Sequence, residues 1–292
     1  MGPPSTSTVR TPAPDGRIPP STEPPSPPRS EGTAARAPRT GRVGAWQLWI
    51  SPVALLVLWQ LAASAGLIPE RLLPSPAAVA TTGIDLARDG TLLSAAGTSL
   101  QRVLAGFAAG APVGLACAVV AGMSRWGENL VDPPLQMLRA VPIFGLIPLF
   151  ILWFGIGETP KVALVAIAVA VPLYINTLAG VRGVDAEHLE VARVLGLGRA
   201  AVVRHVILPG ALPGLLTGLR LSLGGAWLAL IVAEQINADA GLGFMINSAR
   251  EFLRTDVVVL GLVVYSLLGL ATDAIVRLLE RKALAWRPRN RT

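Results

Sequence analysis

The chain has 292 residues, of which 52% are hydrophobic and 15% are charged, and its mean hydropathy is +0.57. Because soluble globular chains are about a quarter charged, this composition excludes an ordinary soluble domain. The formal net charge is +7, yet the basic residues flank apolar segments and form no aromatic-interleaved face of the kind that binds nucleic acid.

Residues 1–43 form a separate compositional class, rich in proline, serine, threonine and arginine. Such a segment cannot bury enough apolar surface to offset the entropy lost on ordering, so we expect a disordered cytoplasmic tail. A proline-rich site for a partner protein is the alternative. The first apolar run starts too late, near residue 45, for an ordinary signal peptide.

Six apolar segments follow, each close to the length of about 20 residues that a membrane-spanning helix needs. They cover residues 46–65, 98–122, 134–155, 162–180, 211–233 and 257–278. The third segment is interrupted by Pro142 and Pro148. The sequence therefore predicts an all-α polytopic membrane protein with six transmembrane helices.

Four parts are expected along the chain. They are the tail 1–43, the first transmembrane helix with an external segment (44–97), a transmembrane core (98–283) and a basic cytoplasmic tail (284–292). Within the external segment, residues 72–93 are predicted to form a turn and a short amphipathic helix.

The distribution of positive charge predicts the orientation, because loops on the cytoplasmic side are enriched in Lys and Arg. With the N-terminus inside the cell, eighteen of the 25 Lys and Arg residues flank the cytoplasmic side, and five flank the outer side. The other two, Arg102 and Arg220, fall within spans. We therefore expect both termini in the cytoplasm of a bacterial cell, with the chain in its plasma membrane.

A polar segment, LEVARVLGLGRAAVVRHVILP at 189–209, separates the fourth and fifth spans. Glu187, Glu190 and Arg193 recur every three residues, as on one face of a helix. Gly196 and Gly198 should break this helix, and a second short helix should then end at Pro209. Two short water-facing helices at an angle suit docking into a groove of another protein. A loop lying on lipid headgroups would satisfy the same pattern.

The spacing within this segment resembles the EAA loop of ABC importer permeases. The matching residues are Glu190, Val191, Ala192, Gly196, Val206, Leu208 and Pro209. The family pattern has Ala where this chain has Val191 and Ile where it has Val206. The resemblance extends through LLPSP at 72–76, SLQRVLAGF at 99–107, ILWFGIGETPK at 151–161, the region 218–227 and AEQINADAGLG at 233–243. These stretches are similar to the nitrate, sulfonate, taurine and bicarbonate branch, above all to its aliphatic-sulfonate permeases.

The resemblance implies the type I ABC importer permease fold and a coupling role for residues 186–209. The coupling residues would be Glu190, Ala192, Gly196, Leu208 and Pro209. In this role Glu190 makes the charged contact with a cytoplasmic ATPase, Gly196 is the bend between two coupling helices, and Leu208 and Pro209 set the loop's angle to the fifth span. The family pattern also implies an ATPase dimer, a permease homodimer in membrane lipid, and an extracellular or lipid-anchored solute-binding protein.

No catalytic function is expected of this chain. Its two lysines, Lys161 and Lys282, lie outside any phosphate-binding G-x-x-x-x-G-K-[ST] loop, so ATP hydrolysis would need a separate subunit. The single cysteine, Cys117, excludes an intrachain disulfide and a cysteine-rich metal site. The two histidines, His188 and His205, lie in or beside the polar segment, and no metal site or cofactor is predicted.

Polar residues within spans are candidates for the translocation path, although helix–helix contact would also explain them. The candidates are Asn176, Thr177, Arg220 and Trp227. Arg220 would contact an anionic solute, or instead pair with Glu234 or backbone carbonyls. We expect an aliphatic sulfonate or taurine as the solute. Nitrate, bicarbonate or an uncharged heterocycle are alternatives within the same class, and a secondary transporter is the alternative outside it.

Overall fold

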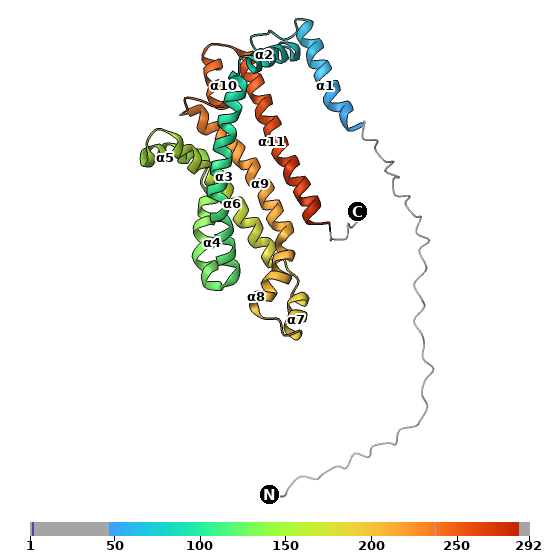
Figure 1. The fold of residues 1–292 in the computed structure, drawn as a ribbon, viewed down its shortest axis with the longest axis vertical. Helices are drawn as coiled ribbons and strands as arrows, with labels where there is room; N and C mark the ends of the chain where they lie inside the picture. The colour runs from blue at the N-terminus through green and yellow to red at the C-terminus, as the bar shows by residue number, and fades with distance from the viewer. Residues whose placement is uncertain (1, 3–46, 237, 286–292) are drawn as a thin grey trace, which may run out of the picture. The chain divides into compact units, whose positions relative to one another are not determined.

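The computed structural model describes residue 2, residues 47–236 and residues 238–285. The chain divides into two units, Met1–Trp49 and Ile50–Thr292, and the architecture below is that of the second unit. The predicted tail 1–43, apart from residue 2, and most of the predicted tail 284–292 lie outside the described residues. Every regular element within the described ranges is a helix (Figure 1), which confirms the all-α prediction.

The first helices of the chain are α1 (Gln47–Ser64), α2 (Pro76–Arg88), α3 (Thr91–Met123), α4 (Arg125–Ala140), the 3₁₀ turn η1 (Ile143–Leu146) and α5 (Ile147–Phe154). They are followed by α6 (Glu158–Arg182), α7 (Ala186–Val194), α8 (Arg199–Val202), the π-helical turn η2 (Val203–Ile207), α9 (Leu208–Ile236), α10 (Leu242–Glu251) and α11 (Thr255–Ala283).

Four helices of the described chain are long and apolar enough to cross a membrane. They are Thr91–Gly122, Glu158–Arg182, Arg199–Ile236 and Thr255–Ala283. A fifth candidate is the bent pair α4 and η1–α5, and the predicted first span corresponds to α1, whose apolar part Ile50–Ser64 is shorter. The expected number of six spans therefore holds only approximately.

The third predicted span is not a single straight helix. Residues 134–155 fall on two helices, Arg125–Ala140 and Ile143–Phe154, which meet at an angle of 95°, and the first of them begins before the predicted span. The break lies at Val141, which is extended (φ −74°, ψ 127°) because the following Pro142 disfavours the helical conformation at the preceding residue. Pro142 thus produces a broken span, whereas Pro148 lies within the first turn of α5.

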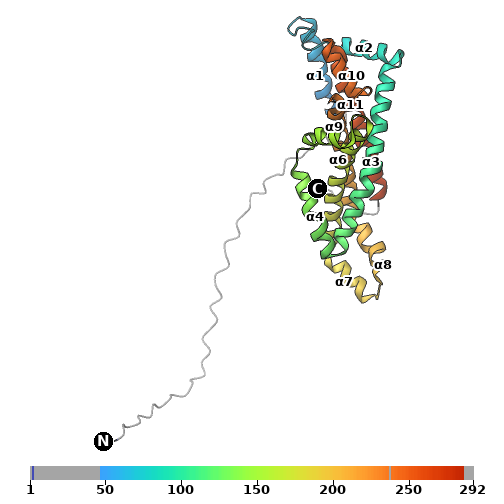
Figure 2. The same ribbon diagram turned by 90° about the vertical axis from the view of Figure 1, so that its left-hand side faces the viewer.

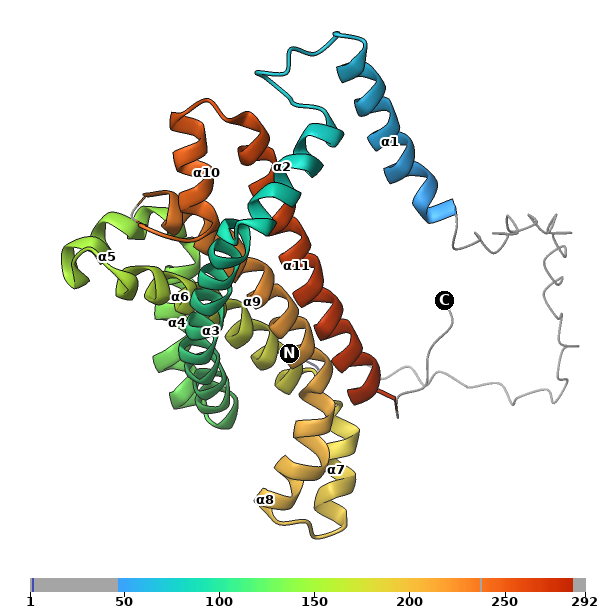
Figure 3. The ribbon, with the colours of Figure 1, turned by 45° about the horizontal axis from the view of Figure 1, so that its top comes forward.

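Glycines bring the three central helices into close contact. An added Cβ at Gly110 or Gly114 of α3 would overlap the backbone of Ala166 or Ala170 of α6. Along this contact the residue numbers of α3 and of α6 rise in the same direction, so the two helices run parallel. Helices α6 and α9 instead run antiparallel and meet where Gly180 faces Gly214. Helix α6 consequently lies between α3 and α9 (Figure 3).

The two ends of this unit carry different short helices (Figures 1 and 2). Helices α7 and α8 lie together at one end, which we call the loop end. Helices α2 and α10 lie at the other, which we call the α10 end. Helix α2 starts with Ser75, whose hydroxyl accepts a hydrogen bond from the amide of Ala78, and with Pro76 at its first position. This agrees with the short helix expected within residues 72–93.

Candidate functional site

The polar segment 186–209 forms a helix, a tight turn and a second helix at the loop end. Helix α7 ends in a Schellman arrangement, in which the amide of Leu197 donates to the carbonyl of Ala192 at 3.0 Å. Gly196 has φ +69°, the left-handed region that favours glycine. The structure therefore places the predicted bend at Gly196. Gly198 has an ordinary φ of −66° and needs no such freedom.

The predicted coupling residues differ in exposure. Ala192 is buried, with 2% of its surface accessible, and anchors α7, whereas Glu190 is exposed. Two apolar neighbours are left uncovered within this chain, because Val194 is 87% exposed and Leu195 is 70% exposed. A charged residue beside bare apolar side chains is the composition of a docking surface rather than of a loop that faces only water.

The expectation that a separate short helix ends at Pro209 is wrong. Helices α8 and α9 are joined through the π-helical turn into one continuous helix, Arg199–Ile236, with Leu208 and Pro209 inside it. A proline normally breaks a helix because it lacks an amide hydrogen. Here the preceding turn changes the hydrogen-bond register, and the amide of Leu208 donates to the carbonyl of Val203, five residues back. The segment that contains the predicted coupling residues thus continues into the membrane helix without a break.

Two of the candidate path residues lie on α6. Asn176 is partly buried, and its amide nitrogen donates to the carbonyl of Pro172 at 2.8 Å. Thr177 is buried, and its hydroxyl has no hydrogen-bond partner among the described residues.

The other two candidates lie on the side of α9 that faces α11. Trp227 is 5% exposed, and its indole nitrogen donates to the hydroxyl of Thr272 at 3.2 Å. The side chain of Arg220 is 50% exposed, and its Nε lies 2.7 Å from a carboxylate oxygen of Asp273. The pairing of Arg220 with Glu234 is wrong, because Glu234 is occupied by Arg102. Whether the four candidates line the path stays a prediction.

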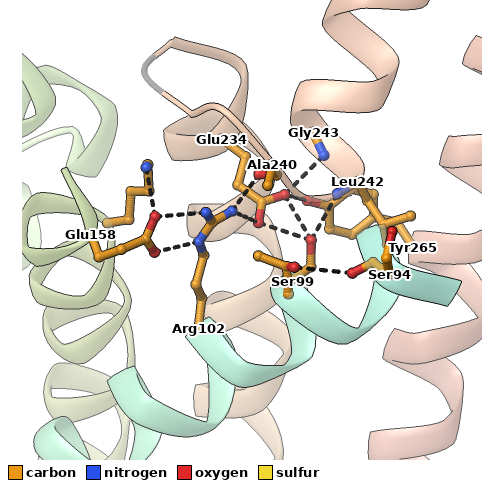
Figure 4. A network of polar contacts seen from close by, with 11 residues as sticks. Ser94, Ser99, Arg102, Glu158, Glu234, Ala240, Leu242, Gly243 and Tyr265 are labelled. Atoms are coloured by element: carbon orange, nitrogen blue, oxygen red, sulfur yellow. Dashed lines mark hydrogen bonds and ion pairs between the residues drawn. The ribbon is translucent and has the colours of Figure 1, made fainter. Parts of the chain in front are cut away.

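A second site, which the sequence analysis missed, lies towards the α10 end. We call it the Arg102 cluster, and it consists of Ser99, Arg102, Glu158, Glu234 and Tyr265 (Figure 4), together with Lys161, whose amino group donates to Glu158 at 3.0 Å. Arg102 lies between two carboxylates. Its Nε and Nη2 donate to Glu158 at 2.6 and 2.7 Å, while its Nη1 donates to Glu234 at 2.6 Å. A buried guanidinium is costly unless it is paired in this way.

Glu234 is 1% exposed, and its carboxylate accepts several hydrogen bonds. The hydroxyls of Ser99 and Tyr265 donate to its carboxylate at 2.8 and 2.6 Å. The amide of Gly243 donates to the same carboxylate at 2.8 Å, and Nη1 of Arg102 also reaches the carbonyl of Ala240 at 2.6 Å. The cluster thus joins α3, α6, α9 and α11 to the segment that begins α10.

One signal for this cluster was present in the sequence. Arg102 is an ionisable residue within a predicted span and Glu234 directly follows another, and such residues usually have a polar partner. Their partners could not be identified from the chain order, because Glu158 and Glu234 follow Arg102 by 56 and 132 residues.

A cavity of about 380 Å³ lies beside α10. Its lining includes Ser94 and Thr98 of α3, Met245 and Ser248 of α10, and the segment 239–241, whose Ala240 carbonyl accepts from Arg102. None of the four candidate path residues contributes to it. The segment 239–241 therefore borders the cavity and also contacts the Arg102 cluster.

Comparisons with known proteins agree with the fold and the motif. The family model of the binding-protein-dependent transport system inner membrane component matches residues 110–284. The aliphatic sulfonates transport permease SsuC of Escherichia coli (strain K12) is 48% identical over 240 residues, which cover 82% of this chain and 91% of that protein. The taurine transport system permease TauC of the same strain is 38% identical over 237 residues, with 80% and 86% covered.

The solved structure of an amino acid ABC transporter with histidines shares the fold of this chain. The TM-score is 0.58 at 20% sequence identity, and the match covers 68% of this chain and 96% of that one. The architecture is that of a type I permease, with several apolar helices and the polar segment between two of them. The chain therefore belongs to the family of binding-protein-dependent transport system inner membrane components, and it is an inner-membrane permease subunit of an ABC importer.

Proposed function

We propose that this permease carries an aliphatic sulfonate across the inner membrane. The observation that carries the proposal is the 48% identity to an aliphatic sulfonates permease across nearly the whole of that protein. The taurine permease is similar over almost the same length. Taurine itself has a sulfonate group, so the solutes named for these two relatives share one anionic headgroup.

We further propose that a separate ATPase docks on residues 186–209. Neither lysine of the chain lies in a phosphate-binding loop, which supports a non-catalytic subunit driven by another polypeptide. Exposed Val194 and Leu195 beside Glu190 supply the apolar and charged contacts for such a partner. Because α8 continues into α9, a displacement of this segment would move the whole membrane helix.

The remaining partners follow the organisation of the class. A second copy of this chain would complete the path, and a closed two-fold dimer is the simplest assembly. A solute-binding protein on the outer side would deliver the solute. Both termini would be cytoplasmic, which the asymmetry in Lys and Arg supports. In this orientation the loop end faces the cytoplasm and the α10 end faces outwards.

Growth of the native host on different sulfur sources tests the proposal. Deletion of the gene should abolish growth on an alkanesulfonate as the sole sulfur source, while growth on sulfate is unchanged. A plasmid copy of the gene should restore growth together with initial uptake of ³⁵S-labelled alkanesulfonate. Competition by unlabelled taurine then tells whether both sulfonates are accepted.

Two outcomes would contradict the sulfonate assignment. One is undiminished alkanesulfonate uptake in the deletion strain. The other is loss of uptake for nitrate, bicarbonate or a heterocycle in its place, which would keep the permease class and change the solute.

A further inference from the structure

Helix α4 runs inside the membrane although one of its sides is polar. Its Glu128 pairs at 2.6 Å with Arg182 at the end of α6, and the hydroxyl of Tyr174 on α6 donates to Asp132 at 2.8 Å. The residue numbers rise along α4 while they fall along α6, so the two helices are antiparallel. Because α6 is long and apolar enough to span the membrane, α4 rises beside it from the side of the loop end into the bilayer (Figure 1).

The surface of α4 that this chain leaves uncovered is divided into two stripes. Four exposed polar residues, spaced by four, seven and three positions, lie on one side of the helix and form the polar stripe. They are Arg125, Asn129, Gln136 and Arg139. Three large residues on the adjoining side form the apolar stripe. They are Trp126, Leu130 and Met137, which are 87%, 75% and 72% exposed. Lipid can cover the apolar stripe, but a polar stripe at membrane depth needs water or another polar surface.

Arg139 is the deepest member of the polar stripe. It follows Glu128 by 11 residues, which corresponds to about 16 Å along the helix axis. Since the apolar part of a bilayer is about 30 Å thick, Arg139 lies close to its middle. Arg139 is one of the eighteen residues assigned above to the cytoplasmic flank, and its depth corrects that assignment without removing the excess of positive charge on that side.

Arg139 differs from the other arginines at membrane depth in its lack of a partner. Arg102 pairs with Glu234, and Arg220 pairs with Asp273. Arg139 is exposed, and its side chain makes no ion pair or hydrogen bond with any residue that the structure describes. A charged residue at this depth faces the interior of the assembly or a water-filled space, because lipid does not solvate it.

The backbone beyond Arg139 points to the same environment. Val141 is extended and 41% exposed, and an added Cβ at Gly145 would meet nothing within 4 Å. The break between α4 and α5 thus leaves the last carbonyls of α4 without helical partners at membrane depth. Non-helical backbone at such a depth occurs where protein encloses it or where it lines a water-filled space. The exposed side chain of Arg139 favours the water-filled space.

We propose that the polar stripe of α4 lines the aqueous path of the solute, and that Arg139 binds the sulfonate group near the middle of the membrane. The sulfonate part rests on the proposed function, whereas the path does not depend on which solute is carried. A guanidinium can donate to two sulfonate oxygens at once. Asn129 and Gln136 supply uncharged hydrogen-bonding groups between Arg139 and the cytoplasmic surface, so the anion can leave without meeting a second strong site at membrane depth.

Cysteine accessibility tests the lining of the path. Gln136→Cys and Met137→Cys, each in a Cys117→Ser background, place a thiol on adjacent residues of the two stripes. The complex with its ATPase is probed in inside-out membrane vesicles with sulfonatoethyl methanethiosulfonate, which does not cross the membrane. Position 136 should react severalfold faster than position 137, because the reactive thiolate forms in water and not in lipid. A thiol at position 136 that reacts no faster than one at 137 would overturn the proposed path.

The charge of Arg139 is tested on the solute and on the reagent. Arg139→Gln should lower initial uptake of labelled alkanesulfonate severalfold, and Arg139→Lys should keep part of it. In the Gln136→Cys background, Arg139→Gln should also lower the ratio of two labelling rates, that of the anionic reagent to that of its cationic trimethylammonium analogue. A residue that only stabilises the fold would leave this ratio unchanged, because the same thiol reports both rates.

Arg125→Gln is the matched control, because Arg125 lies on the same stripe at the first residue of α4. It is about 21 Å from Arg139 along the helix axis, further than exposed charges interact at physiological ionic strength. Uptake and the ratio of labelling rates should therefore stay at the parent values. Equal effects of Arg125→Gln and Arg139→Gln would mean that α4 lies along the membrane surface, which would contradict the proposal.

The remaining outcomes separate the path from the solute. Normal uptake and an unchanged ratio in Arg139→Gln would overturn the binding role of Arg139. If that variant fails to accumulate, excess alkanesulfonate should slow labelling of position 136 in the protein that keeps Arg139, and no slowing would overturn the same role. Absence of alkanesulfonate uptake by the parent protein would instead contradict the proposed function, while the comparison of positions 136 and 137 would still decide the path.

Discussion

Charged residues within the membrane helices fall into two kinds, distinguished by exposure. The side chain of Arg102 is 6% exposed and lies between Glu158 and Glu234, so its charge is compensated inside the protein. The side chain of Arg220 is 50% exposed, and its partner Asp273 is shared with Arg277 at 2.7 Å. Two guanidinium groups around one carboxylate leave a net positive charge that an anionic solute can approach.

Arg220→Gln is expected to lower uptake of the sulfonate while the amount of protein in the membrane and its binding to the ATPase stay normal. The guanidinium can bind two sulfonate oxygens at once, and the amide lacks the charge. Arg220→Lys should restore uptake only partly, because it keeps the charge but loses the two-pronged geometry. Initial rates of labelled sulfonate uptake, measured beside expression and co-purification, check this prediction.

Asp273→Asn separates the two roles that Arg220 can have. If Arg220 serves the solute, removal of its carboxylate partner leaves the guanidinium available, and uptake should persist. If Arg220 serves only the ion pair between α9 and α11, both variants should lower the amount of protein together.

Two turns determine how the segment 186–209 is joined to the rest of the chain, one at Gly196 and one at Val203–Ile207. Helix α7 ends at Gly196 in a left-handed conformation, and the chain then starts a helix that continues to Ile236. The π-helical turn before Pro209 makes this continuity possible. The proposed docking surface, made of α7 and α8, is therefore joined to the core through one continuous helix, and hydrogen bonds within the bend hold α7 to that helix's start.

Substitutions at this bend should uncouple the transporter. A Cβ at Gly196 would meet no atom within 4 Å, but its φ of +69° costs a side chain about 1 to 2 kcal/mol. Gly196→Ala should therefore weaken binding of the ATPase, Gly196→Trp should weaken it further, and Glu190→Lys should do so by reversing the contact charge. Co-purification with the ATPase and solute uptake are the measurements.

Gly198→Ala is the matched control for this experiment. Gly198 also has free space around a Cβ, but its backbone has a φ that any residue adopts. The Gly198→Ala variant should therefore bind the ATPase as well as the parent protein does. Full association and uptake in both Gly196→Trp and Glu190→Lys would show that the segment is only a surface loop.

The molecule as a whole combines a glycine-packed group of three helices with different short elements at its two ends. The loop end carries the exposed coupling segment, and the α10 end carries the Arg102 cluster and the cavity. This division matches the needs of a permease, in which energy enters on one side of the membrane and the solute on the other. The basic residues flanking the spans predict that the loop end is the cytoplasmic one.

Single-cysteine labelling in intact cells should establish this orientation, in a background without Cys117. A thiol at position 85, on exposed α2, should react with an impermeant maleimide. Thiols at positions 20 and 285 should react only after the cells are lysed. Reaction of position 20 in intact cells would reverse the proposed map, and with it the side on which the ATPase docks.

Properties that depend on a single stretch of chain could be predicted from the sequence. The apolar runs predicted membrane helices because their length is matched to the bilayer. Pro142 marked the broken span, and the spacing from Glu190 to Pro209 marked the coupling segment. Each of these signals lies within one element or one turn, so no knowledge of neighbouring helices was needed.

The partners of the charges within the membrane helices were decided by the tertiary structure alone. Arg102 with Glu234, and Arg220 with Asp273, are pairs whose members lie on different helices. Sequence shows that such a charge needs a partner, but several carboxylates satisfy that need equally, and helix packing selects one. The continuity of the helix through Pro209 was decided in the same way, because the hydrogen-bond register of the preceding turn is a property of the folded backbone and not of residue type.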